Sequence, residues 1–157
     1  LMSKPSSSHR RVSSWMQWWE LDVHLTPGDL VEFSSVSHIH WAVFEQTFNG
    51  EAYVIHYWNE DDEEETQSSR NPRIFGSICE IIGDVQVRRD TLAAVAKGCL
   101  CRINNKLDMQ HTSFTPEEIV SRARGQIGNA TRYHLMYNNC EHFANWCRYG
   151  EEKSQQV

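Results

Sequence analysis

Short apolar runs bounded by turn residues dominate the first two-thirds of the chain, and this pattern is typical of strands. Asn49-Gly50 separates two of these runs and is a strong signal for a β-hairpin. A later run, 78–89, is interrupted by Gly83-Asp84 and predicts one bent strand or two. The other predicted strands cover residues 29–33, 40–48, 51–58, 99–103 and 133–137.

The region after residue 114 carries the signals of a helix. Thr115 is suited to cap it, with Pro116 at the first helical position and Glu118 completing a capping box. Gly128 stops this helix. One face of the helix is apolar and is formed by Ile119, Val120, Ala123 and Ile127.

A second helix is predicted over residues 140–149. Asn139 is a natural N-cap for it, and Gly150 ends it. The chain therefore runs through several strands, a helix, a strand and a last helix. This order predicts an α+β fold in which helices pack on an antiparallel sheet.

Composition places the chain among globular proteins. Its 157 residues fit one domain, and 39% are hydrophobic and 23% charged. The net charge of −6 argues against nucleic acid as a partner, because its phosphates reward clustered positive charge. The longest apolar run, 92–96, is far shorter than the roughly 20 residues of a membrane-spanning helix. No signal peptide is visible, and five cysteines, an odd number, favour a reducing compartment.

A separate segment is predicted at each end of the chain, on either side of the main domain. Residues 1–25 form a flexible N-terminal segment, rich first in serine and then in tryptophan, and residues 151–157 form a tail. Two interpretations of the tryptophan-rich stretch 15–25 stay open. It packs on the domain, which is favoured, or it anchors the protein at a lipid surface, where tryptophan prefers the headgroup boundary. The acidic stretch 59–76 is predicted to be a solvated loop.

Cys140 is the first candidate nucleophile. With Asn139 as the cap, its sulfur lies in the first turn of a helix, where unpaired N–H groups favour the nucleophilic thiolate. The same N–H groups are donors for an oxyanion formed during attack on a carbonyl. The alternative is a small buried thiol on an amphipathic helix, and Cys147 fits that description. Position alone supports both interpretations of Cys140 equally.

The thiol needs a base, and the chain has eight histidines. His40 and His56 lie in the two strands of the predicted hairpin. A single histidine in a strand is more often structural than catalytic, but two histidines on one face favour catalysis. Whether they share a face depends on the hairpin loop, because directly opposed residues of an antiparallel pair point to the same side.

A regular two-residue turn at Asn49-Gly50 makes the numbers of opposed residues sum to 99 and separates the two histidines. A three-residue loop that begins at Phe48, with Gly50 in a bulge, makes the sum 98. His40 and His56 then lie on one side of the hairpin. The sequence therefore predicts an odd loop or a bulge, and a regular two-residue turn would contradict the histidine pair.

In this geometry His40 takes the thiol proton, and His56 holds the His40 ring in place as the third member of a triad. The pairs His38-x-His40 and Cys99-x-Cys101 also raise the alternative of a zinc site. Neither pair has the spacing of structural zinc ligands, so metal binding ranks well below catalysis. No metal and no cofactor are predicted.

Together these segments resemble the lecithin:retinol acyltransferase family, over about residues 26–150. Two further segments, Ile103-Asn-Asn-Lys106 and Arg148-Tyr-Gly150, are similar to its HRAS-like suppressor branch of phospholipase A/acyltransferases. The motifs that carry the family resemblance are Pro27-Gly-Asp-Leu-Val-Glu-Phe33, His40-Trp-Ala-Val-Phe44, Tyr53-Val-Ile-His56 and Asn139-Cys-Glu-His-Phe143.

The resemblance implies a fold like that of circularly permuted papain-like enzymes. It implies Cys140 as the nucleophile, His40 as the base and His56 as the second histidine, and Asn139 matches the residue that the family usually carries before the nucleophile. On this basis residues 26–150 are expected to be the catalytic domain.

The implied function is that of a phospholipase A and acyltransferase that works through an acyl-thioester on Cys140. Water or an amine or lysophospholipid acceptor then receives the acyl group. The expected partners are a glycerophospholipid and a membrane surface, with the protein cytoplasmic and peripheral to membranes or anchored there by a segment outside this sequence. The alternatives are retinol as the acceptor, an amide substrate as in bacterial relatives, and a catalytically silent binding or regulatory module.

Overall fold

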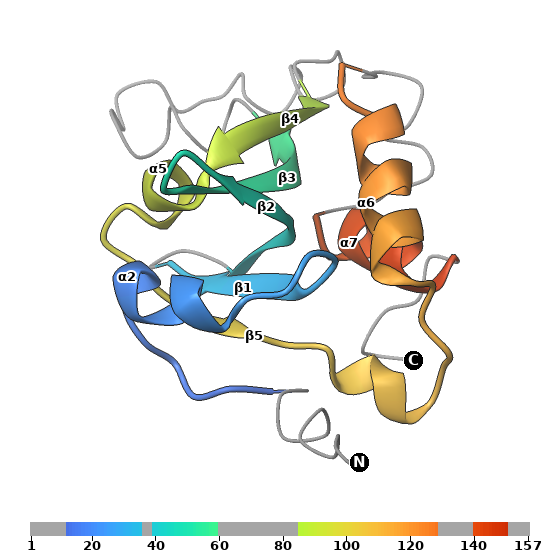
Figure 1. Ribbon diagram of the computed structural model, residues 1–157, viewed down its shortest axis with the longest axis horizontal. Helices are drawn as coiled ribbons and strands as arrows, with labels where there is room; N and C mark the ends of the chain where they lie inside the picture. Colours follow the sequence, from blue (N-terminus) through green and yellow to red (C-terminus); the bar gives the residue numbers. More distant parts are fainter. Residues whose placement is uncertain (1–11, 36–38, 60–84, 129–139, 151–157) are drawn as a thin grey trace, which may run out of the picture.

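A five-stranded antiparallel sheet forms the centre of the computed structural model, which describes residues 12–35, 39–59, 85–128 and 140–150 (Figure 1). The order of the strands is β4-β3-β2-β1-β5, so the predicted α+β class with an antiparallel sheet is confirmed. The predicted strand 133–137 and the stretch 60–76 lie outside the described residues. The strands are β1 (Leu30–Ser34), β2 (Ile39–Phe48), β3 (Glu51–Asn59), β4 (Val85–Thr91) and β5 (Leu100–Ile103).

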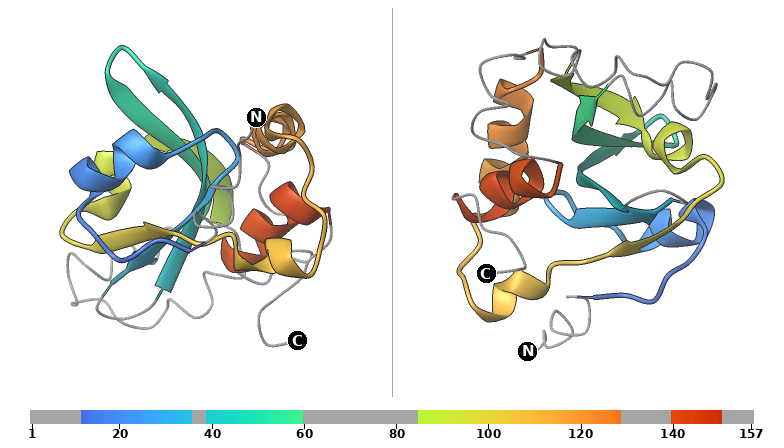
Figure 2. Two further views of the ribbon diagram at one scale, coloured as in Figure 1. Left: turned by 60° about the horizontal axis from the view of Figure 1, so that its bottom comes forward. Right: turned by 180° about the vertical axis from the view of Figure 1, so that it is seen from behind.

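Helices cover both faces of the sheet. In Figures 1 and 2, α6 and α7 lie on one side of the sheet, and α2 and α5 lie on the other. Two of these helices are predicted from the sequence, whereas the short α2 and α5 are not. The helical elements are α2 (Trp18–Leu21), η1 (Asp22–His24), α5 (Leu92–Ala96), η2 (Lys106–Met109), α6 (Pro116–Gly125) and α7 (Cys140–Tyr149).

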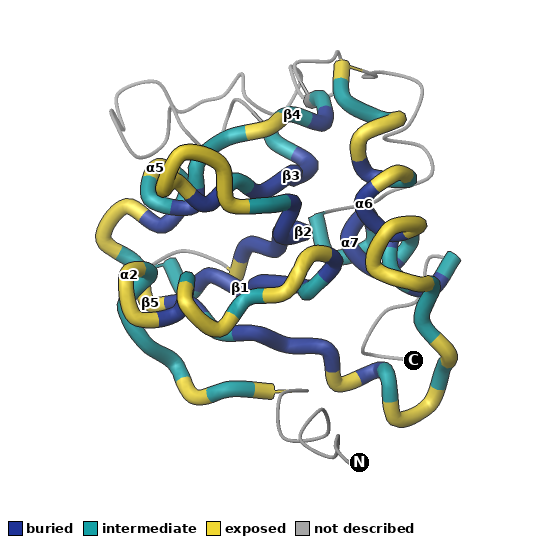
Figure 3. Tube along the Cα trace, in the orientation of Figure 1, coloured by how far each residue is buried: buried dark blue, intermediate teal, exposed yellow. Residues whose placement is uncertain are grey.

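Each face of the sheet has its own hydrophobic core, and the central strands β1, β2 and β3 are mostly buried between the two cores (Figure 3). On β2, Trp41 and Val43 belong to the core under α6 and α7. Ala42 and Phe44 belong to the core under α2 and α5. This alternation follows from the two-residue period of a strand. Because both faces are covered, β2 is a nearly continuous apolar run rather than an alternating one.

The β2–β3 hairpin differs from the prediction in the place of its irregularity. Asn49 and Gly50 have φ angles of 52° and 80°, which fits a regular two-residue turn with two left-handed positions. Gln46 pairs with Tyr53 but Phe44 with Val54, so the sum of paired residue numbers falls from 99 to 98. The extra residue between Phe44 and Gln46 makes a β-bulge inside β2.

The hairpin therefore has a bulge, but it lies at Glu45 in β2 and not at Gly50 as predicted, and the predicted three-residue loop is wrong. The expectation that a regular turn would separate the histidines is also wrong, because that expectation allowed for an irregularity only in the loop and not within the strand. Continued along the strands, the register of 98 puts His56 opposite Ala42 and on the same face as His40. A bulge can lie anywhere in a strand, and turn residues alone do not locate it.

The helix signals at the end of the chain are confirmed. The Thr115 side chain accepts a hydrogen bond from the Glu118 backbone N–H, and the Glu118 carboxylate accepts from the Thr115 N–H, which completes the capping box. The helix α7 covers the predicted residues 140–149, and Gly150 follows it with a φ angle of 90°. The predicted cap Asn139 lies outside the described residues.

The N-terminal segment runs beside the edge strand β5. Val12 and Met16 form isolated β-bridges to Asn104 and Cys101. The Arg102 guanidinium lies 4.4 Å above the centre of the Trp15 ring. Within the described residues, none of the helices has the length and apolar character needed to cross a bilayer.

The Thr115 cap generates a stability prediction. We expect Thr115→Ala to destabilise the protein by about 1 kcal/mol and to lower Tm by about 2–4 °C, because the Glu118 backbone N–H loses its side-chain acceptor. Ser121→Ala in the exposed middle of α6 is the matched control, since alanine is favourable there. Thermal unfolding followed by circular dichroism measures both variants. Equal losses in the two variants would refute the role of the cap.

Candidate active site

The two predicted histidines lie side by side in the sheet. His40 is near the start of β2 and His56 is in β3, and both are buried. His40 Nε2 lies 2.8 Å from His56 Nδ1, which is hydrogen-bond distance. The two rings are nearly perpendicular, with an interplanar angle of 80°. The structure thus joins the two imidazoles by one nitrogen of each.

A third group, Asp90 of β4, extends this pair and was missed by the sequence analysis. His56 Nε2 lies 2.8 Å from Asp90 Oδ2. On its other side, Asp90 Oδ2 accepts a hydrogen bond of 3.0 Å from Arg88 Nε. The predicted strand 78–89 ended one residue short of Asp90. Only the pairing of β4 with β3, which the sequence does not reveal, brings this carboxylate to His56.

The charges along this row follow from burial and from the partners. Burial lowers the pKa of His56, and this outweighs the hydrogen bond and charge of Asp90, which raise it. Burial alone would raise the pKa of Asp90, but the hydrogen bonds from His56 and Arg88 hold it below its ordinary value. His56 is therefore neutral and Asp90 ionised near neutral pH.

These charge states assign the protons in the row. An ionised carboxylate only accepts hydrogen bonds, so His56 Nε2 carries a proton and donates a hydrogen bond to Asp90. The Nδ1 atom of neutral His56 must then accept, and His40 Nε2 donates to it. In neutral His40 the remaining nitrogen, Nδ1, has a lone pair. Asp90 thus sets the tautomers of both histidines.

The sulfur of Cys140 lies next to the backbone at the start of β2, beside His40. Cys140 is the first residue of α7, and its Sγ is 3.9 Å from the carbonyl oxygen of Ile39. That carbonyl belongs to the peptide bond that joins Ile39 to His40. Of the two ring nitrogens of a histidine, Nδ1 is the one nearer its own backbone. The partly buried Cys140 also packs against the core under α6 and α7.

Apolar and aromatic groups surround the row of polar side chains. The Phe33 and Trp58 ring centres lie 5.9 Å and 6.0 Å from that of His40. Burial, followed by the charge of the nearby Cys140, raises the pKa of Tyr57 to about 12, so its hydroxyl stays protonated. In such surroundings the hydrogen bonds of the row are stronger than they would be in water.

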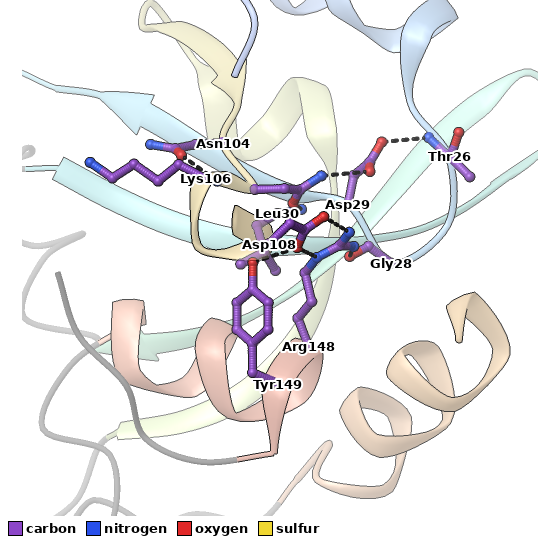
Figure 4. Close-up of polar contacts among 10 residues, drawn as sticks. Thr26, Gly28, Asp29, Leu30, Asn104, Lys106, Asp108, Arg148 and Tyr149 are labelled. Atoms are coloured by element: carbon purple, nitrogen blue, oxygen red, sulfur yellow. Dashed lines mark hydrogen bonds and ion pairs between the residues drawn. The ribbon is translucent and has the colours of Figure 1, made fainter. Parts of the chain in front are cut away.

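The position of Cys140 depends on how α7 is held at its other end. Arg148 Nη2 donates to Asp108 Oδ2 at 2.8 Å, and Arg148 Nη1 donates to the Gly28 carbonyl at 2.8 Å (Figure 4). The Tyr149 hydroxyl donates to Asp108 at 2.7 Å. These bonds tie the last turn of α7 to η2 and to the loop before β1. The helix is thereby fixed relative to the strand that carries His40.

The other cysteines of the described residues do not share these features. Burial raises the pKa of Cys101 to about 12 and also raises the pKa of Cys99 and of Cys147. All three are therefore protonated near neutral pH. Across the described ranges, no group of three or more His, Cys, Asp or Glu side chains is arranged so that it could hold a metal ion, and His38 of the zinc alternative lies outside these ranges.

The chain is similar in sequence to known proteins over most of its length. Residues 23–153 match the family described as lecithin retinol acyltransferase. Human phospholipase A and acyltransferase 4 is 33% identical over 132 residues, which are 83% of this chain and 74% of that protein. Human phospholipase A and acyltransferase 2 is 32% identical over 130 residues, again 83% of this chain and 74% of that protein. Human phospholipase A and acyltransferase 5 is 33% identical over 132 residues, which are only 43% of that protein.

The lowered pKa of His56 generates a prediction about stability and pH. Below its ordinary value of 6.5, the unfolded chain binds a proton at His56 that the folded protein does not yet bind. The free energy of unfolding should thus be highest above about pH 6.5 and fall as the pH drops through the folded pKa. Urea titrations between about pH 8 and about pH 5 measure this slope. His56→Gln should flatten it, and an unchanged slope in that variant would refute the assignment.

Proposed function

The chain belongs to the lecithin retinol acyltransferase family, and from this premise we propose that it is a phospholipase A and acyltransferase. Its substrate is a glycerophospholipid, and its nucleophile is Cys140. The observation that carries the proposal is the position of the Cys140 sulfur beside the peptide of His40, whose ring is hydrogen-bonded to His56. The names of the relatives, which are phospholipases and acyltransferases, support the choice of substrate class.

The first step makes an acyl-thioester. His40 Nδ1 takes the proton of the Cys140 thiol, and the start of the ten-residue helix α7 stabilises the negative charge on sulfur. The thiolate attacks the ester carbonyl, and the bond from the carbonyl carbon to the glycerol oxygen breaks. His40 returns its proton to that oxygen, so a lysophospholipid leaves. Backbone donors at the start of α7, with Asn139 beside them, are proposed to stabilise the oxyanion.

The second step removes the acyl group from sulfur. His40 takes a proton from water, or from an amine or lysophospholipid acceptor, which then attacks the thioester. The carbon–sulfur bond breaks and the thiol of Cys140 is restored. Water gives a fatty acid and thus phospholipase A activity, whereas an acceptor gives a transferred acyl chain.

His56 and Asp90 act through His40 rather than on the substrate, so they are positioning residues. When His40 becomes protonated, His56 Nδ1 accepts a hydrogen bond from the Nε2–H of His40. The ionised Asp90, on the other side of His56, stabilises the positive charge of the His40 ring. The row therefore keeps the His40 ring in one orientation in both protonation states.

The nucleophile can be tested by intact mass spectrometry. After incubation with phospholipid vesicles, the wild type should carry an acyl adduct that Cys140→Ala abolishes together with lysophospholipid release. Cys99→Ala is the matched control and should keep both, because Cys99 lies in the loop before β5. An adduct that persists in a folded Cys140→Ala variant would disprove the assignment. A wild type that forms neither adduct nor lysophospholipid would favour a silent binding module.

The role of Asp90 can be tested through the tautomer of His40. An amide at this position can donate as well as accept, so Asp90→Asn no longer sets the protons of the row. We expect kcat to fall by at least about 100-fold with little change in KM. Alkylation of Cys140 by iodoacetamide near neutral pH should slow in parallel, whereas Asp22→Asn serves as the unaffected control. If kcat and alkylation rate both stay at the wild-type level, Asp90 is only a structural residue.

A further inference from the structure

The bulge in β2 raises the question of what holds the register of the hairpin. In many sheets a one-residue slip is costly because it moves apolar side chains from the core into water. This penalty is weak in β2, since Trp41 and Val43 are buried on one face and Ala42 and Phe44 on the other. The hydrophobic pattern therefore does not set the register by itself.

The bulged residue, Glu45, is a buried carboxylate held by two arginines. Its side chain has no exposed surface, and Arg89 Nε and Nη2 donate to its two oxygens at 2.8 Å each. Arg124 of α6 donates to Oε2. Burial alone would raise the pKa of Glu45, but the hydrogen bonds and charges of the two arginines hold it below its ordinary value. We call Glu45, Arg89 and Arg124 the Glu45 ion cluster.

A slip of the register would break this cluster. Without the bulge, the ladder that starts at the turn would pair Glu45 with Val54. Val54 and Ile55 point to opposite faces, and Ile55 is the residue that pairs with Arg89. Glu45 and Arg89 would then lie on opposite sides of the sheet. The slip would leave a buried charge without its partner, which is strongly destabilising.

The same slip would break the catalytic row. Without the bulge, His56 would lie opposite Val43 rather than Ala42. Val43 and His40 are three residues apart and point to opposite faces of β2. The ion pair between β2 and β4 and the histidine pair between β2 and β3 therefore require one and the same register.

We propose that the Glu45 ion cluster selects the bulged register of the β2–β3 hairpin and thereby holds His56 against His40. Glu45 is then a positioning residue of the acyl-transfer site, although its carboxylate faces the α6 side of the sheet. This inference rests on the proposed function for its link to catalysis. The link between Glu45 and the register does not depend on the proposed function, because it rests on the strand pairing and on the contacts of Glu45.

Two variants separate the carboxylate from the extra residue. Glu45→Val keeps the extra residue but removes the charge, and valine favours a regular strand. Deletion of Glu45 removes both, and the remaining pairs Gln46–Tyr53 and Phe44–Val54 then follow each other in one regular ladder. Arg89 and Arg124 have side chains 42% and 47% exposed, so water can hydrate their charges in the shortened chain.

Two NMR measurements report the result. Cross-strand nuclear Overhauser effects distinguish the pairing of Val43 with Ile55 from its pairing with His56. Long-range ¹⁵N–¹H spectra of the imidazoles report the tautomers of His40 and His56. We expect Glu45→Val to lose the Val43–Ile55 pairing and the histidine hydrogen bond, and the deletion variant to keep both. Turnover should fall about 100-fold in Glu45→Val and be at least about tenfold higher in the deletion variant.

The outcomes distinguish this inference from the proposed function. Glu45→Val with the native pairing and native histidine tautomers overturns the inference, as does a folded deletion variant that loses them. If Glu45→Val does not fold, the deletion variant alone decides in the same way. A wild type that shows no phospholipid turnover, with NMR results as expected, overturns the proposed function and leaves the role of Glu45 in the register intact.

Discussion

An ionised carboxylate has no proton to give, and this sets the direction of every hydrogen bond from Asp90 to His40. If His56 were protonated, both of its nitrogens would donate, and His40 Nε2 would have to accept. The proton of a neutral His40 would then lie on its Nδ1 atom, which is the ring nitrogen nearer the backbone that Cys140 contacts. The burial that keeps His56 neutral is therefore as important as the carboxylate itself.

The antiparallel sheet is what makes such a row possible. Its members come from three neighbouring strands, β2, β3 and β4, so each hydrogen bond crosses one strand spacing. The proposed nucleophile, Cys140, comes instead from a helix whose opposite end is tied down by Arg148. The proposed base and the proposed nucleophile are thus placed by two separate parts of the fold. Their relative position depends on the packing of α7 against β2 and β3, where Phe143 and Ala144 are fully buried.

The parts of the fold with local causes could be predicted, and those with distant causes could not. Thr115 and Gly150 mark helix ends by their own side chain or backbone, and Asn49-Gly50 marks a turn in the same way. Glu45 and Asp90 give no local signal. Each is recognised only by its arginine or histidine partners on other elements. The pairing of β4 with β3 brings these partners together, and the sequence does not reveal that pairing. The circularly permuted arrangement and the oxyanion role of Asn139 stay predictions.

The segment along β5 has a consequence for how molecules meet one another. An edge strand offers unpaired N–H and C=O groups on which a second chain can build further strands. Here the Met16 N–H donates to the Cys101 carbonyl and the Met16 carbonyl accepts from the Cys101 N–H, while the Ser13 N–H donates to the Ile103 carbonyl. The segment thus covers this edge as a short extra strand would. A protein shortened past Met16 would expose the unpaired N–H and C=O groups of β5, which is the kind of edge on which a second chain can pair.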